Sequence, residues 1–210
     1  MRAFFLSFLL FLLPAAALAE DSGEVILVVG DSLSAGYGLR PGEGWVNLLE
    51  RRLEREGYPH QVINASVSGE TTRGALARLP RALALHRPSL VIIELGGNDG
   101  LRGFPLDVMR ANLGELIRLS REAGAEVMLL GMHLPPNYGE EYTRRFHQVF
   151  VDLADAEQVP FLPFILEDVA TKPGMMQADG IHPTAEAQPL MLESLWPVLE
   201  RLLEVAETAS

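Results

Sequence analysis

The chain has 210 residues, a formal net charge of −11 and 48% hydrophobic residues. This length suits one domain with a sizeable core, and the acidic balance argues against a nucleic-acid partner and against attraction to anionic membranes. The sequence contains no cysteine, so disulfides are excluded and the hydrophobic core alone must hold the fold.

The first residues have the pattern of a secretory signal peptide. A basic start at Arg2 precedes an apolar run over residues 4–13 and the small-x-small site Ala17-Leu18-Ala19. The run is too short to span a bilayer, and its flanks match an exported precursor. A membrane anchor or a buried strand is the alternative interpretation. We expect cleavage near Ala19, one domain over residues 20–210, and a bacterial periplasmic or secreted protein without a stable membrane anchor.

Downstream, apolar runs alternate with helical patterns. The expected strands cover residues 25–29, 61–64, 90–95, 126–131 and 160–163, and the expected helices cover residues 42–56, 71–84, 106–123, 141–158 and 185–204. Pro197 should bend or split the last helix. The strand runs are continuous rather than alternating, which indicates burial on both faces. The predicted fold class is α/β, a three-layer α/β/α sandwich with a five-stranded parallel sheet in the flavodoxin-like order 2-1-3-4-5.

A candidate nucleophile follows the first expected strand. The segment Gly30-Asp31-Ser32-Leu33-Ser34 delivers Ser32 to the carboxyl edge of the sheet, where open α/β sheets bind ligands. It differs from the Gly-x-Ser-x-Gly elbow, because Ser34 stands in place of the second glycine. A loop serine that caps a helix is the alternative interpretation.

Two further segments follow the second and third strands. They are residues 66–70 and residues 95–100. The N–H of Gly69 in the first segment, and the side-chain amide of Asn98 in the second, can each point at a developing oxyanion. Ordinary turns would have the same residue types. The neighbouring acids Asp31 and Asp99 are expected to hold these loops through backbone hydrogen bonds.

The fourth segment is Asp179-Gly180-Ile181-His182-Pro183. An aspartate three residues before a histidine can accept the Nδ1 proton and leave Nε2 free for Ser32. A metal pair or a solvated loop is the alternative, but the sequence has no His-Glu-x-x-His motif and no further clustered ligand. We therefore expect no metal and no cofactor. His133, after the fourth strand, is expected to be a wall residue.

These four segments, in this order, resemble the SGNH, or GDSL, family of serine hydrolases over essentially the whole mature chain. The segments 94–104, 134–139 and 176–183 are similar to the bacterial periplasmic thioesterase I, lysophospholipase L1 and arylesterase branch of that family.

The resemblance implies a role for each candidate residue. Ser32 would be the nucleophile, His182 the base and Asp179 its orienting partner. The Ser32 N–H, the Gly69 N–H and the Asn98 side chain would form the oxyanion hole.

The predicted function is hydrolysis of acyl esters and thioesters through an acyl-enzyme on Ser32, by a monomer whose partner is a small-molecule substrate. A loop directly after Asn98 is expected to line the acyl channel. Its residues are Gly100, Leu101, Arg102, Gly103, Phe104 and Pro105. A carbohydrate acetylesterase and a non-catalytic acyl-binding protein are the alternatives. Trp45 and Trp196 fall on helix stripes typical of a core, which disfavours an aromatic sugar groove.

Overall fold

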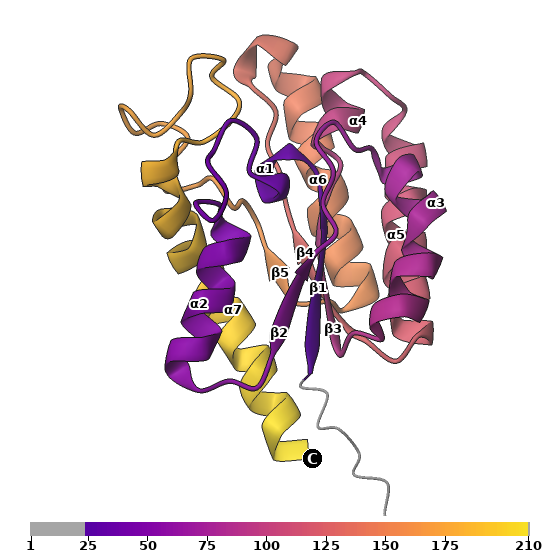
Figure 1. The fold of residues 1–210 in the computed structure, drawn as a ribbon. Helices are drawn as coiled ribbons and strands as arrows, with labels where there is room; N and C mark the ends of the chain where they lie inside the picture. The colour runs from indigo at the N-terminus through magenta and orange to yellow at the C-terminus, as the bar shows by residue number, and fades with distance from the viewer. Residues whose placement is uncertain (1–23, 210) are drawn as a thin grey trace, which may run out of the picture.

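The computed structural model describes residues 24–209, so the predicted signal peptide and its cleavage site lie outside the described residues. A five-stranded parallel sheet runs through the centre of the molecule (Figure 1). The strands are β1 (Val25–Gly30), β2 (Gln61–Asn64), β3 (Leu90–Glu94), β4 (Glu126–Leu130) and β5 (Phe161–Leu162). Their order, β2-β1-β3-β4-β5, confirms the predicted topology.

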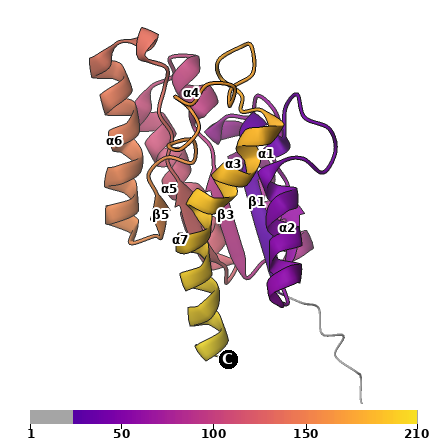
Figure 2. The same ribbon diagram turned by 90° about the vertical axis from the view of Figure 1, so that its left-hand side faces the viewer.

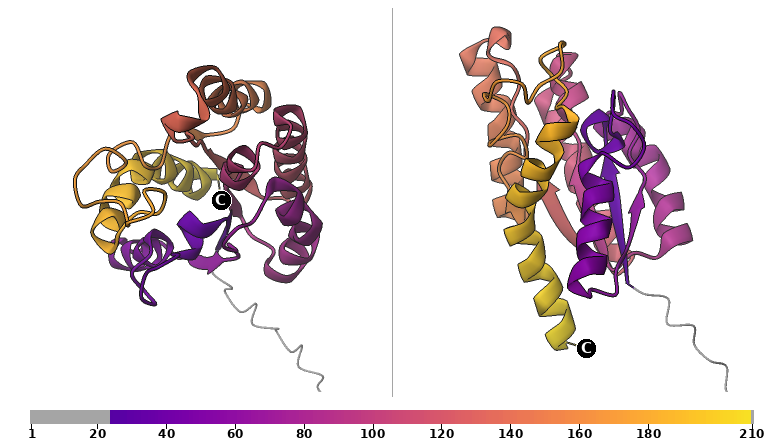
Figure 3. Two further views of the ribbon diagram at one scale, coloured as in Figure 1. Left: turned by 90° about the horizontal axis from the view of Figure 1, so that it is seen from above. Right: turned by 60° about the vertical axis from the view of Figure 1, so that its left-hand side comes forward.

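Helices cover both faces of the sheet, as the side view of Figure 2 and the view from above in Figure 3 show. One face carries α2 (Trp45–Glu56) and α7 (Gln188–Ala209). The other carries α3 (Thr72–His86), α5 (Leu106–Glu122) and α6 (Glu140–Glu157). The predicted three-layer sandwich is therefore confirmed. None of the helices within residues 24–209 combines the length and the apolar character needed to cross a bilayer.

The core consists of two apolar clusters separated by the sheet. Alternate residues of β1 serve the two sides: Leu27 and Val29 face α3 and α5, whereas Ile26 and Val28 face α2 and α7. All four side chains are at most 1% exposed. A strand buried on both faces explains the continuous apolar run in the sequence. Trp45 and Trp196 are also buried in the core, as their helix stripes predicted.

Three local features differ from the sequence-based expectation. Helix α2 begins at Trp45 rather than at residue 42, because Gly44 is extended and acts as its N-cap. Helix α7 begins at Gln188, after the short 3-10 turn η2 (Ala185–Ala187). It then continues unbroken through Pro197, so the expected split is wrong. Leu195 and Leu199, on either side of the proline, are fully buried, and this packing outweighs the backbone hydrogen bond that proline cannot donate.

The carboxyl ends of the strands meet at one edge of the sheet, at the top of Figure 1. Short elements that the sequence analysis missed lie there: α1 (Ser32–Ala35), α4 (Gly97–Leu101) and the 3-10 turn η1 (Pro136–Tyr138). Each lies in the connection that follows a strand, and elements of three to five residues are too short to give a periodic pattern.

Candidate active site

Ser32 is the first residue of α1 and stands at the end of β1. Its position results from the two residues before it. Asp31 is the N-cap of α1, and its carboxylate accepts a hydrogen bond from the Leu33 N–H at 3.1 Å. Gly30 allows the close turn, because a Cβ there would lie 2.7 Å from the Ser34 side chain and 2.8 Å from a carboxylate oxygen of Glu94. The sequence Gly-Asp-Ser thus ends a strand and starts a helix within one residue.

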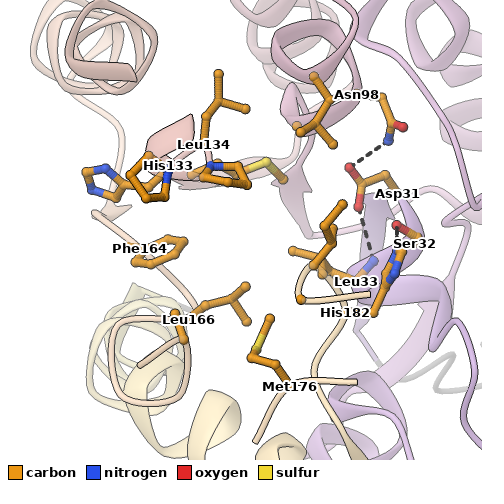
Figure 4. A pocket seen from close by; sticks show the side chains of 18 of the residues that line it. Asp31, Ser32, Leu33, Asn98, His133, Leu134, Phe164, Leu166, Met176 and His182 are labelled. Atoms are coloured by element: carbon orange, nitrogen blue, oxygen red, sulfur yellow. Dashed lines mark hydrogen bonds between the residues drawn. The ribbon is translucent and has the colours of Figure 1, made fainter. Parts of the chain in front are cut away.

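Ser32, His182 and Asp179 form a continuous chain of hydrogen bonds. The Nε2 atom of His182 lies 2.8 Å from the Ser32 Oγ, and its Nδ1 atom lies 2.7 Å from Asp179 Oδ2 (Figure 4 draws the Ser32–His182 bond). Because a carboxylate only accepts, Nδ1 carries the proton and Nε2 is free to accept from the serine. The three residues are brought together from opposite ends of the chain, as their types and spacing predicted.

Asp179 is held in its charged form by its own loop. Its Oδ1 accepts hydrogen bonds from the backbone N–H groups of Ile181 and His182, each at 3.0 Å. The hydrogen bond from the His182 side chain, followed by those two backbone bonds, lowers the pKa of Asp179 to about 2. An antiparallel bridge between Met176 and Pro183 closes the base of this loop.

Asn98 lies in α4 and faces the same cavity as Ser32. Its Nδ2 donates to Asp31 Oδ2 at 3.1 Å, so the side-chain amide is oriented by a carboxylate (Figure 4). Its second Nδ2 proton remains for another acceptor. Asn98 lines the same cavity as Ser32 and His182.

Gly69 lies in the loop after β2, with φ at 79°. This loop stays attached to the end of β1, because the Val67 N–H donates to the Gly30 carbonyl at 3.0 Å. The Gly69 carbonyl accepts from Arg102 at 3.0 Å, which ties the loop to the C-terminal end of α4. Gly69 is not among the residues that line the cavity, and its assignment to the oxyanion hole remains a prediction.

A buried acid that the sequence analysis missed lies against Ser34, two residues beyond Ser32. Glu94 ends β3 and is fully buried, and its Oε2 accepts from the Ser34 hydroxyl at 2.6 Å. Burial raises the pKa of Glu94 well above its ordinary value, and burial likewise raises the pKa of Asp31 to about 6. The available signal was a glutamate at the end of an otherwise apolar strand, where a charge is costly unless it is paired or protonated.

The predicted loop-holding acids behave as expected. Asp31 accepts from the backbone of Leu33, and Asp99 accepts from both the N–H and the hydroxyl of Thr72, at 2.9 and 2.6 Å. Asp99 therefore joins α4 to the start of α3.

A cavity of about 510 Å³ opens directly beside the Ser32–His182 pair. Its walls are mainly apolar and come from the ends of β1, β4 and β5 and from the long segment before α7 (Figure 4). The apolar lining residues are Leu33, Leu101, Met132, Leu134, Pro135, Pro136, Phe164, Leu166, Ala170, Met176 and Ile181. His133 also lines it, as a wall residue.

Of the loop predicted to line the acyl channel, only Leu101 reaches this cavity. Gly100 is buried, with its carbonyl accepting from the Tyr142 hydroxyl at 3.0 Å. Arg102 points its guanidinium to the Gly69 carbonyl, and Phe104 is 44% exposed outside the cavity. Gly103 and Pro105 are exposed as well.

The wall residues that the sequence analysis missed follow β4 and β5. They include Met132, Leu134, Pro135 and Pro136 after β4, and Phe164 and Leu166 after β5. The carboxyl-edge rule that located Ser32 and Asn98 applies equally to these later strands, so their apolar residues could have been found by the same argument.

A parallel α/β/α sandwich with a serine, a histidine and an aspartate in hydrogen-bond contact at the carboxyl edge defines a serine hydrolase of the α/β class. The chain belongs to the GDSL-like lipase/acylhydrolase family, whose model matches residues 28–189. It is therefore an ester hydrolase.

The chain is similar to several curated hydrolases along most of its length. It is 51% identical to esterase TesA of Pseudomonas aeruginosa, over 88% of this chain and 92% of that protein. It is 47% identical to an arylesterase of Vibrio mimicus, over 90% and 93%. It is 41% identical to thioesterase 1/protease 1/lysophospholipase L1 of Escherichia coli, over 92% and 90%. A crystal structure of TesA superposes with a TM-score of 0.83 at 52% identity, covering 85% of this chain and 99% of that one.

Proposed function

We propose that this protein hydrolyses acyl esters and thioesters through a covalent acyl-enzyme on Ser32. The observation that carries the proposal is the hydrogen-bonded chain from Ser32 to His182 to Asp179, at 2.8 and 2.7 Å, at one end of an apolar cavity. The curated relatives are named as an esterase, an arylesterase and a thioesterase, which fits both ester and thioester substrates.

In the first half-reaction, the Ser32 oxygen attacks the acyl carbon while His182 Nε2 takes its proton. Asp179 accepts from Nδ1 and stabilises the imidazolium that forms. The oxyanion accepts hydrogen bonds from the Ser32 N–H, the Gly69 N–H and the Asn98 side chain. His182 then gives its proton to the departing alkoxide or thiolate, which leaves the acyl group on Ser32.

In the second half-reaction, water attacks the acyl-enzyme with the same His182 as base. The tetrahedral intermediate collapses, the Ser32 oxygen recovers its proton, and the carboxylic acid leaves. No step calls for a cofactor.

The shape of the cavity supports an apolar acyl or aryl group as the part of the substrate that is bound. Its volume lies within the usual range for small-molecule sites, and its walls are largely carbon. The buried positions of Trp45 and Trp196 leave neither ring available to stack on a sugar, which disfavours the acetylesterase alternative.

Replacing Ser32 with alanine tests the proposal against a non-catalytic acyl-binding protein. We expect Ser32→Ala to lower kcat with 4-nitrophenyl butyrate by about 10⁵-fold or more, with an unchanged circular dichroism spectrum. Wild-type protein should be labelled by a fluorophosphonate, and Ser32→Ala should not. Ser34→Ala, two positions along the same helix, is the matched control and should still be labelled. Turnover in Ser32→Ala near the wild-type rate would rule out the assignment.

The acyl-binding surface is tested by comparing Leu101, which lines the cavity, with Phe104, which does not. Each methylene buried is worth about 0.8 kcal/mol, or about fourfold in kcat/KM. We expect Leu101→Ala to reduce kcat/KM selectively for long acyl esters, and Phe104→Ala to leave the chain-length preference unchanged. Equal losses on short and long esters in Leu101→Ala would argue for a packing role instead.

We also propose that residues 1–19 are a signal peptide and that the mature enzyme acts as a monomer in the bacterial periplasm or outside the cell. The basic start, short apolar run and small-residue site support this. Expression of the full chain in a Gram-negative host should yield periplasmic protein whose N-terminal residue is Glu20. An N-terminus at Met1 in a membrane fraction would contradict it.

A further inference from the structure

Tyr37 lies directly against the ring of His182. The two ring centroids are 4.4 Å apart, with the planes tilted by 38°. Tyr37 comes from the turn after α1, far from His182 in the sequence, and half of its surface is exposed. The two nitrogens of the imidazole already contact Asp179 and Ser32. The tyrosine ring is thus a third contact, made through the ring itself rather than through either nitrogen.

The backbone of Tyr37 is hydrogen-bonded to Ser32 and, through Gln177, is linked to the loop that carries His182. Its N–H donates to the Ser32 carbonyl at 3.1 Å, so it is fixed to the helix that carries the nucleophile. Its carbonyl accepts from the Gln177 side chain at 2.9 Å, and the same amide nitrogen donates to the Pro183 carbonyl at 3.0 Å. The Gln177 N–H also donates to the His182 carbonyl at 2.7 Å.

Gly38 makes this arrangement possible. Its φ is 75°, and a Cβ at this position would lie 2.3 Å from the Gln177 side-chain oxygen. A larger residue would therefore push away the amide that joins the Tyr37 turn to the histidine loop. The glycine at position 38, its positive φ and the hydrogen bonds of Gln177 together hold Tyr37 close to His182.

We propose that Tyr37 is a positioning residue for His182, held in place by Gln177. This inference rests on the proposed function, in which His182 is the base. His182 sits in a loop with little regular structure, and its partner Asp179 has a side chain that is 39% exposed. Without a neighbour on its ring, the imidazole could rotate away from Ser32. The tyrosine ring blocks that rotation, and an aromatic ring within about 6 Å also attracts the imidazolium that forms during acylation.

A role in binding the substrate is the competing explanation, and the location of Tyr37 disfavours it. Tyr37 is not among the residues that line the cavity beside Ser32. A substrate contact would raise KM, whereas misplacement of the base would lower kcat with KM nearly unchanged. The two roles therefore predict different kinetic changes.

The test compares Tyr37→Leu with Tyr37→Phe, because phenylalanine keeps the ring and leucine does not. With 4-nitrophenyl butyrate, we expect kcat to fall about tenfold in Tyr37→Leu, since small misplacements of a reacting group are costly. KM should stay within about twofold, and Tyr37→Phe should restore kcat. The low-field proton NMR signal of the His182 Nδ1–H, bonded to Asp179, should broaden or disappear in Tyr37→Leu and remain in Tyr37→Phe.

Two further variants sharpen the test. Gln177→Leu should also lower kcat, by a smaller factor than Tyr37→Leu. The fold-loss in kcat of the double variant should be smaller than the product of the two single fold-losses, because both residues act on the same imidazole ring. Tyr138→Leu removes another tyrosine exposed at the same edge of the sheet and should leave the low-field signal intact. An unchanged kcat and NMR signal in Tyr37→Leu, or a rise in KM alone, would overturn the inference.

Failure of the proposed function has a separate signature. If His182→Ala keeps both wild-type activity and the low-field signal, His182 is not the base and the proposed function fails. If His182→Ala loses both while Tyr37→Leu loses neither, only the positioning role of Tyr37 fails.

Discussion

The acids on the two sides of Ser32 lie in opposite environments. Asp31 and Glu94, at the ends of β1 and β3, are 3% and 0% exposed, and burial raises the pKa of both. Asp179 lies in an exposed loop, where hydrogen bonds lower its pKa to about 2. The comparison teaches that exposure does not weaken an acid as an acceptor when its own loop supplies N–H donors. The buried acids, in contrast, hold α1 and Asn98 in place through hydrogen bonds, at a cost in stability.

The largest effect on kcat should come from replacing the exposed acid, Asp179. We expect Asp179→Asn to lower kcat by about a thousandfold. An asparagine NH2 group in the position of Asp179 Oδ2 cannot accept the Nδ1 proton of His182, so the tautomer with the proton on Nε2 is favoured. Thermal stability should change little, since the side chain is exposed. The measurement is kcat together with the melting temperature. If Asp179→Asn retains full activity, another carboxylate orients His182.

Among the buried acids, replacing Asp31 with asparagine should have a moderate effect on kcat. The single amide oxygen cannot serve both the Leu33 N–H and the Asn98 side chain, so Asn98 becomes less well oriented. Loss of a whole oxyanion donor costs about 10²- to 10³-fold, and loosening one should cost about tenfold in kcat. Asn98→Ala measured alongside gives the full loss. A larger fall in Asp31→Asn than in Asn98→Ala would mean that Asp31 acts by another route.

The buried acids should also leave a signature in the pH dependence of stability. A carboxyl group whose pKa is raised on folding stabilises the folded state at low pH, and this stabilisation is lost as the pH rises through the folded pKa. For Asp31 the loss extends from about pH 3.8 to about pH 6 and just beyond. For Asp179, whose pKa is lowered, stability is instead lost as the pH falls from 3.8 towards 2.

Glu94→Gln tests this reasoning, because glutamine can accept from Ser34 and never ionises. Its melting temperature relative to wild type should increase steadily as the pH rises above about 4.5, by a few degrees in total. The measurement is calorimetry of both proteins between pH 4 and pH 9. Parallel curves would show that folding does not raise the pKa of Glu94.

The smallest expected effect is that of a chelator. No group of three metal-binding side chains lies together within residues 24–209, and the proposed mechanism needs no metal. Incubation with EDTA should therefore leave kcat unchanged. Loss of activity that zinc or calcium restores would contradict the mechanism.

The sequence predicted the parts of the molecule that depend on chemical type and long-range order. All five strands, their order and the contacts among Ser32, His182 and Asp179 follow from apolar runs and from residues placed after strands. Of the cavity walls, only Leu101 and His133 were predicted. The carboxyl-edge rule also brings the segments after β4 and β5 to the site, but the inward position of side chains such as Phe164 and Leu166 depends on how the folded chain packs. The role of Glu94 also depended on a depth of burial that only the packed sheet reveals.

The proposed nucleophile and base also lie at opposite ends of the polypeptide. Ser32 follows the first strand, whereas His182 precedes only the short turn η2 and the final helix α7, which packs against α2. During synthesis, Ser32 emerges from the ribosome long before His182, its proposed base. If the proposed mechanism holds, the Ser32 hydroxyl of a growing chain is inert until about residue 182 has been added. Under the proposed mechanism, a fragment truncated before Asp179 would keep Ser32 without its base, and hydrolysis would begin only once this last part of the chain has folded onto the rest.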